Sequence, residues 1–176
     1  MDTTLITIIS SFVFLVLLWI VVGVRHLKGA KKTLDSSWEF VDEKIRKRHD
    51  LAPVLVECAR SSGADSSFGE LVEKMIPLRD AARRIYFPCT EKNEKEVAFG
   101  GVLKSMISYG EKSDVVKNTY FLEIKKEISD IDTDILNRSR DYNDVAAKYN
   151  KSLDNVLLKP LALVLKSRKA EVFNFS

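Results

Sequence analysis

One stretch of sequence decides the fold: residues 121–156 read FLEIKKEISDIDTDILNRSRDYNDVAAKYNKSLDNV. Apolar and aromatic side chains recur there at alternating steps of three and four residues, the spacing of one face of an α-helix. The positions on this face are Phe121, Ile124, Ile128, Ile131, Ile135, Arg138, Tyr142, Val145, Tyr149, Ser152 and Val156. Intrinsic propensity alone rarely stabilises so long a helix, so we expect it to pack against a partner along its length.

An earlier stretch, residues 34–59, supplies that partner. The same spacing places one seam on Leu34, Trp38, Val41, Ile45, Arg48, Ala52, Leu55 and Ala59. Two shorter helices are predicted between the long ones, over residues 68–86 and 91–109, and polar turns separate them. The predicted fold class is all-α: an N-terminal transmembrane helix that continues into a long antiparallel four-helix bundle.

The N-terminal helix is predicted from residues 5–24, which contain no charged side chain. A helix of twenty residues crosses roughly 30 Å, the thickness of the hydrocarbon core of a bilayer, and only Thr7, Ser10, Ser11 and Gly23 interrupt the large apolar side chains here. A cleaved signal peptide would have a basic start and a shorter apolar core, and this sequence has neither. We therefore expect an uncleaved, single-pass membrane anchor.

The charges that flank this run predict its orientation. Arg25, Lys28, Lys31 and Lys32 follow the run, and no Lys or Arg precedes it. The positive-inside rule then leaves residues 1–4 outside and puts the basic juxtamembrane segment, 25–32, and the bundle, 33–158, in the cytoplasm. The expected location is the cell (inner) membrane. The two cysteines, Cys58 and Cys89, fit a reducing compartment.

A second basic cluster, Lys166, Arg168 and Lys169, lies in the C-terminal segment, residues 159–176. The net charge of +3 therefore comes from the two flanks of the bundle, whereas a nucleic-acid-binding domain carries its basic excess as a patch on the fold. We expect anionic lipid as a partner and no nucleic acid. The apolar residues 161–165 have two interpretations, a membrane-interfacial segment or a cap on the bundle.

Catalytic and metal-binding motifs are not apparent in the sequence. Asp130, Asp132 and Asp134 have the spacing that opens a calcium loop, but the glycine and glutamate that such a loop needs later are missing. Neither histidine has a second ligand at zinc spacing. Phosphate-binding loops and nucleophile motifs are also missing. We predict no catalytic, cofactor or metal site, and a protein that is not an enzyme.

Two motifs resemble those of a known family. The first runs from Trp38 through Arg48-x-Asp50 to Pro53, and the second is a Tyr-Asn pair that repeats after seven residues. Behind an N-terminal span, this combination resembles the LemA family. The resemblance implies a membrane-anchored, mostly cytoplasmic helical bundle with no established enzymatic activity. The residues that carry it are Trp38, Arg48, Asp50, Pro53, Tyr142, Asn143, Tyr149 and Asn150.

The motif residues also have physical interpretations. Arg48 and Arg138 occupy seam positions, so each should find a carboxylate or backbone carbonyls, or extend to the edge of the bundle. Asp50 is expected to cap the turn that carries Pro53, where the helix should kink. The Tyr-Asn pairs are expected to fix the register of the packed helices, as buried polar residues do in coiled coils.

These features predict a non-enzymatic, membrane-anchored scaffold or interaction module at the cytoplasmic face of the membrane. Its partners would be other proteins or a second copy of the chain. One alternative is an accessory subunit of a membrane signalling or stress-response complex. Another is an enzyme whose site is completed by a partner.

Overall fold

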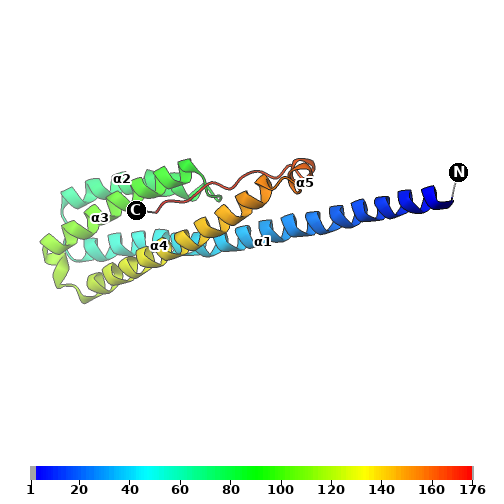
Figure 1. The fold of residues 1–176 in the computed structure, drawn as a ribbon. Helices are drawn as coiled ribbons and strands as arrows, with labels where there is room; N and C mark the ends of the chain where they lie inside the picture. The colour runs from blue at the N-terminus through cyan, green and yellow to red at the C-terminus, as the bar shows by residue number, and fades with distance from the viewer. Residues whose placement is uncertain (1–2, 176) are drawn as a thin grey trace. The chain divides into compact units, whose positions relative to one another are not determined.

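The structure is a computed structural model that describes residues 3–175. Its elements in chain order are α1 (Thr3–Ser61), α2 (Ser66–Arg83), α3 (Thr90–Lys112), the 3-10 helix η1 (Asp114–Lys117), α4 (Thr119–Asp154) and α5 (Lys159–Val164) (Figure 1). The described residues form helices and connecting segments, with no strand among them. The prediction of an all-α helical bundle is confirmed. The predicted external segment, 1–4, begins with two residues that lie outside the described part.

The chain divides into two compact units, which we describe separately. The anchor unit consists of residues 1–36 and 144–170, and the bundle unit consists of residues 37–143 and 171–176. Helices α1 and α4 each contribute to both units.

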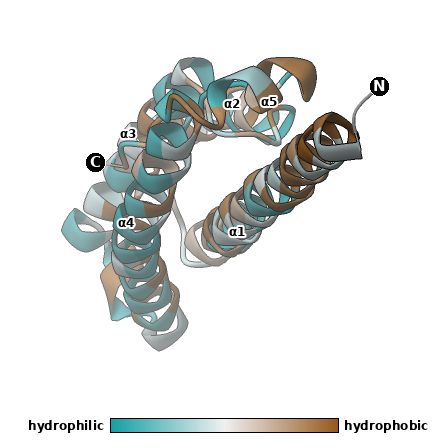
Figure 2. Ribbon diagram, turned by 45° about the vertical axis from the view of Figure 1, so that its right-hand side comes forward, coloured by the Kyte–Doolittle hydropathy of each residue, from teal (hydrophilic) through white to brown (hydrophobic). Residues whose placement is uncertain are grey.

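The apolar run of the anchor unit forms the first part of α1 (Figure 2). Its side chains are exposed; Ile8 and Phe12, for example, each show 67% of their surface. Among the described residues, α1 is the one helix long and apolar enough to cross a membrane. These properties are consistent with the predicted membrane anchor.

Gly23, near the end of the apolar run, is the contact point between α1 and the segment around α5. A Cβ atom added at Gly23 would lie 2.3 Å from Leu161 Cδ1 and 3.2 Å from Leu158 Cδ2. Leu161 and Ala162 are buried on α5. The two leucines therefore pack directly on the α1 backbone, a close approach that any residue larger than glycine would obstruct.

The core of the bundle unit contains side chains from all four of its longer helices. The predicted seam of the first long helix is correct, because each of its eight positions is buried. Its last three positions, Ala52, Leu55 and Ala59, belong to one core cluster with Phe68, Val72 and Met75 of α2, Phe99, Leu103 and Met106 of α3, and Phe121, Ile124 and Ile128 of α4. Helices α2 and α3 also pack against each other.

The predicted seam of α4 is correct at Tyr142 and Tyr149, which are buried, but wrong at Arg138, Val145, Ser152 and Val156. Ser139 is buried there in place of Arg138, and its hydroxyl donates to the Ile135 carbonyl. Arg138 instead lies over the ring of Phe40, 5.5 Å from its centroid. A strict three-four step has a period of 3.5 residues, whereas an α-helix has 3.6, so the buried face drifts along a long helix. Further along, Ala146 and Leu153 are buried in place of Val145 and Ser152, and Val156 is exposed beyond the helix end.

Two glycines of α3 provide a matched test of the packing. A Cβ atom at Gly110 would lie 2.2 Å from Cζ of the buried Phe121, whereas one at Gly101 would meet no atom within 4 Å. We predict that Gly110→Ala lowers the free energy of unfolding by about 1–3 kcal/mol through overpacking. Gly101→Ala should raise it by up to ~1 kcal/mol through helix propensity. Urea unfolding followed by circular dichroism measures both, and equal stabilities of the two variants would contradict this packing.

Candidate functional site

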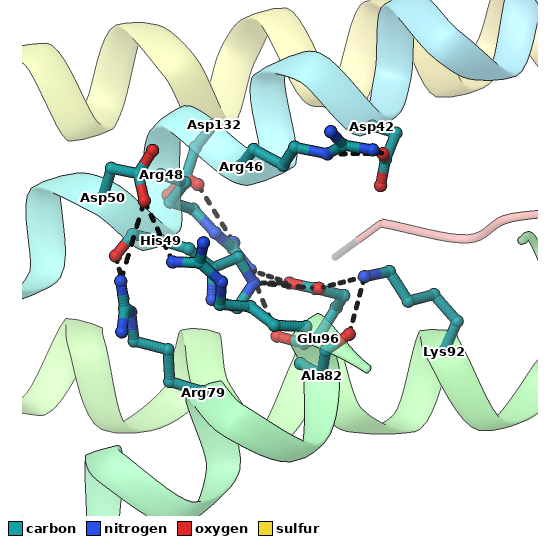
Figure 3. Close-up of polar contacts among 11 residues, drawn as sticks. Asp42, Arg46, Arg48, His49, Asp50, Arg79, Ala82, Lys92, Glu96 and Asp132 are labelled. Atoms are coloured by element: carbon teal, nitrogen blue, oxygen red, sulfur yellow. Dashed lines mark hydrogen bonds and ion pairs between the residues drawn. The ribbon is translucent and has the colours of Figure 1, made fainter. Parts of the chain in front are cut away.

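Charged side chains form a cluster in the interior of the bundle unit (Figure 3). Arg48 and His49 on α1 and Lys92 and Glu96 on α3 are each exposed by only 1–2%. Asp132, on α4, completes the cluster and is partly exposed. Ionised groups are seldom buried so fully unless they are paired, so the partners of each group decide what the cluster does.

Glu96 is the centre of this cluster. Its carboxylate lies 2.8 Å from Arg48 Nη2, 3.0 Å from His49 Nε2 and 3.0 Å from Lys92 Nζ. Arg48 Nη1 also reaches Asp132 Oδ1 at 3.1 Å, and Lys92 Nζ donates to the carbonyl of Ala82, on α2, at 2.8 Å. Of the partners predicted for Arg48, the structure shows two carboxylates, and Nη2 also donates to the backbone carbonyl of Glu96 at 3.3 Å. The cluster links α1, α2, α3 and α4.

The surroundings of the cluster shift its pKa values. Burial lowers the pKa of His49, so the ring is neutral at neutral pH and donates from Nε2 to Glu96. For Glu96, burial alone would raise the pKa, but the hydrogen bond from His49, the charge that His49 carries once it is protonated at low pH, and the charges of Lys92 and Arg48 outweigh it and lower the pKa to about 2. The carboxylate is therefore ionised, as its cationic partners require.

Pro53 explains a further contact of the cluster. A proline has no N–H, so Pro53 cannot donate to the carbonyl of His49 four residues earlier. Arg79 Nε, on α2, donates to that carbonyl instead, at 2.8 Å. The helix continues through Pro53. The family-motif proline thus frees an acceptor on α1 that a side chain of α2 uses.

Asp50 does not cap a turn, contrary to our prediction. Because α1 continues past Pro53, no helix end lies nearby to be capped. Asp50 Oδ1 instead pairs with Arg83 Nη1 at 3.0 Å and with Arg79 Nη2 at 3.6 Å. This residue therefore forms ion pairs between α1 and α2.

Two concave features lie next to these contacts. A polar cavity of about 320 Å³ is lined by His49, Lys92, Arg46, Arg84 and Asp80, among others. A more apolar groove of about 660 Å³ runs between α1 and α2, and its lining includes Pro53, Val56, Val72, Met75 and Ile76. Within residues 3–175, no group of three or more His, Cys, Asp or Glu side chains could hold a metal ion.

The Tyr-Asn motif holds the end of the chain. Residues 167–175 have no helix or strand, and we call residues 170–175 the C-terminal tail. Asn143 Nδ2 donates to the carbonyl of Phe173 at 3.0 Å, and the N–H of Phe173 donates back to Asn143 Oδ1 at 2.9 Å. The Tyr142 hydroxyl donates to the carbonyl of Glu171 at 2.9 Å. One amide side chain thus satisfies both backbone groups of one tail residue.

The second Tyr-Asn pair makes the same contact within the anchor unit. Asn150 Nδ2 donates to the carbonyl of Ala170 at 2.9 Å, and the N–H of Ala170 donates to Asn150 Oδ1 at 2.8 Å. Tyr149 is buried. The repeated asparagines therefore bind tail backbone, a contact that the sequence did not predict for them.

Trp38, from the other motif, forms the aromatic wall for this tail in the bundle unit. Its ring packs edge-on against Tyr142 and Phe173, with centroids 5.4 Å and 5.1 Å away. Its indole N–H donates to the carbonyl of Tyr86 at 2.9 Å. Phe173 is fully buried as a result.

Sequence reasoning missed Asn93 on α3. Its Nδ2 donates to the carbonyl of Val172 at 3.3 Å, and the N–H of Asn174 donates to its Oδ1 at 3.2 Å. Asn93 stands in a charged stretch with no motif around it. The sequence feature that could have pointed to this contact lies in the tail. Phe173 and Phe175 alternate there with polar residues, a pattern typical of an extended segment with one buried face.

Both predicted basic clusters are on the surface of the anchor unit. All four basic side chains after the apolar run are exposed, and so are Lys166, Arg168 and Lys169. Lys31 pairs with Asp35, and Lys169 Nζ lies 2.8 Å from Asp154 Oδ2.

The pKa shifts predict acid sensitivity. Folding lowers the pKa of His49 below 6.5 and that of Glu96 from 4.5 to about 2, so the folded state binds fewer protons than the unfolded state at both sites. The free energy of unfolding should fall as pH drops below 6.5 and fall further between 4.5 and about 2. Urea titrations across this range measure the slope.

Between pH 4.5 and about 2, Glu96→Gln should reduce the slope of the free energy of unfolding against pH, because the glutamine side chain does not titrate. Glu123→Gln, which changes an exposed carboxyl on α4, is the matched control and should keep the wild-type slope. An unchanged slope in Glu96→Gln would show that the cluster does not set the acid sensitivity.

Comparison with known proteins agrees with these motifs. The model of the LemA family matches residues 37–176, which are most of the chain and include both motifs. No curated protein matches the sequence. The family match, together with the helical bundle that carries both motifs, shows that the chain belongs to the LemA family.

Proposed function

We propose that this protein is a non-enzymatic, single-pass membrane protein that serves as a scaffold or interaction module at the cytoplasmic face of the cell membrane. The apolar run of α1 crosses the bilayer, with its N-terminal end outside. Four exposed basic side chains directly after the run support this orientation.

The packing of Leu158 and Leu161 on Gly23 is the observation that carries the proposal. Gly23 belongs to the apolar run, so α5 lies beside the end of the membrane span within the anchor unit. Leu163 and Val164, also on α5, expose 72% and 80% of their surface. Exposed aliphatic side chains at the end of a span favour contact with lipid over contact with water.

The charges around α5 support the same position. Lys166, Arg168 and Lys169 follow α5 and are exposed. Each cation near an anionic leaflet contributes roughly 1 kcal/mol to membrane binding. We therefore propose that the C-terminal segment is membrane-interfacial, and that anionic lipid binds both basic clusters.

The interior of the bundle unit supports a role in interaction. Glu96, Arg48 and Lys92 are buried and pair with one another, as groups that stabilise a fold do. Amide side chains of the same unit hold a stretch of non-helical backbone, and many interaction domains bind extended partner segments through their backbone.

Removal of the second basic cluster tests the membrane contact. In the full-length protein in anionic liposomes, we predict slow hydrogen exchange over residues 163–169. Changing Lys166, Arg168 and Lys169 together to Gln should accelerate this exchange and leave the bundle unit protected, because the electrostatic attraction to lipid is lost and the exposed Lys169–Asp154 pair, which is lost with it, contributes little to stability.

A matched control changes Lys104, Lys112 and Lys126, three exposed lysines of the bundle unit, to Gln. This variant loses the same charge but should exchange like the wild type. Equal protection of residues 163–169 in the first triple variant, or in uncharged liposomes, would overturn the proposed lipid contact.

A further inference from the structure

We propose that the bundle unit contains a receptor groove for an extended peptide, and that the C-terminal tail is a resident ligand that a segment of a partner protein displaces. The groove consists of Trp38, Asn93, Tyr142 and Asn143. The inference deepens the proposed function, on which it rests, by naming the chemistry of the partner: an extended segment with a phenylalanine at the position of Phe173.

The groove binds both edges of the tail backbone. Along an extended chain, the N–H and C=O groups of successive residues point to opposite sides. Asn143 binds both groups of Phe173 on one side, and Asn93 binds the carbonyl of Val172 and the N–H of Asn174 on the other. These four hydrogen bonds use main-chain groups that any extended segment, except one with proline at a donor position, can offer.

Side-chain selectivity comes mainly from one pocket. Phe173 is fully buried, and its ring lies 5.1 Å from that of Trp38. Val172, its neighbour, keeps 52% of its surface exposed and is therefore not selected in the same way. Phe175 adds a cation–π contact, with Arg48 Cζ 4.7 Å from its centroid. The groove thus selects an aromatic residue at one position and tolerates variation beside it.

The tail is suited to exchange with another segment. It has no helix or strand of its own, and residues 167–175 are all non-helical. Its release removes the hydrogen bonds, the contact of Phe173 with Trp38 and the cation–π contact of Phe175 with Arg48, whereas the core cluster of the four helices contains no tail residue. A competing peptide with the same backbone geometry and a phenylalanine at the position of Phe173 can form the same hydrogen bonds and the same contact with Trp38 that the departing tail gives up.

Peptide binding to the full-length chain tests the proposal. The probe is a fluorescent peptide with the sequence of residues 169–176, KAEVFNFS, and the protein is reconstituted in liposomes. In the wild type, the attached tail competes with the probe. Phe173→Ala in the chain weakens this competitor, so the probe should bind at least about 10-fold more tightly than to the wild type, given the usual cost of removing a buried phenylalanine.

Two matched pairs identify the groove. In the Phe173→Ala chain, a further Asn143→Ala should weaken probe binding by about 10-fold or more because two hydrogen bonds are lost, whereas Asn137→Ala, at an exposed asparagine of α4, should not. In the probe, alanine at the position of Phe173 should abolish binding, and alanine at the position of Val172 should change it less than about 3-fold, as expected for an exposed side chain.

If Phe173→Ala unfolds the chain, the test uses the wild type and an isotope-labelled probe. Excess probe should then accelerate hydrogen exchange in residues 171–175 of the chain. If the wild-type chain forms dimers and the probe dissociates them, the result would support the proposed groove. It would also identify the tail of a second copy of the chain as the partner segment. A folded chain that neither binds the probe nor releases its tail would overturn the proposal, and it would leave the membrane contact of the proposed function unaffected.

Discussion

The bundle depends on the burial of one carboxylate, that of Glu96. An ionised carboxylate in the interior is costly unless cations and hydrogen-bond donors surround it. Arg48 and His49 from α1 and Lys92 from α3 meet this need, and Arg48 and Lys92 extend the contact to α4 and α2. Because each partner comes from a defined position on its helix, the requirement to pair this charge also specifies how the helices are aligned.

Much of this fold could be predicted from periodicity alone. The seam of the first long helix is buried at every predicted position, and the need of Arg48 for a polar partner, a carboxylate or backbone carbonyls, follows from its place on that seam. The identity of that carboxylate could not be predicted, because Glu96 is 48 residues away on a helix with no motif. The seam error at Arg138 arose because small differences in period accumulate over a long helix.

The role of the Tyr-Asn repeat was the least predictable feature, because its partner is backbone, which has no sequence signature. Asn143 and Asn150 each bind both main-chain groups of one tail residue, Phe173 and Ala170. Each asparagine thus has a physical role beyond helix register within its own unit.

A double-mutant cycle at Arg48 and Glu96 tests the central claim most directly. The free energies of unfolding of the wild type, Arg48→Met, Glu96→Gln and the double variant would be compared at neutral pH. If the buried pair organises the bundle, each single change should cost about 3–5 kcal/mol, because Glu96→Gln leaves the buried Lys92 without a carboxylate and Arg48→Met removes one of the cations that compensate the charge of Glu96. The double variant should then cost at least ~2 kcal/mol less than the sum of the two single changes. Costs that add within ~0.5 kcal/mol would contradict this account.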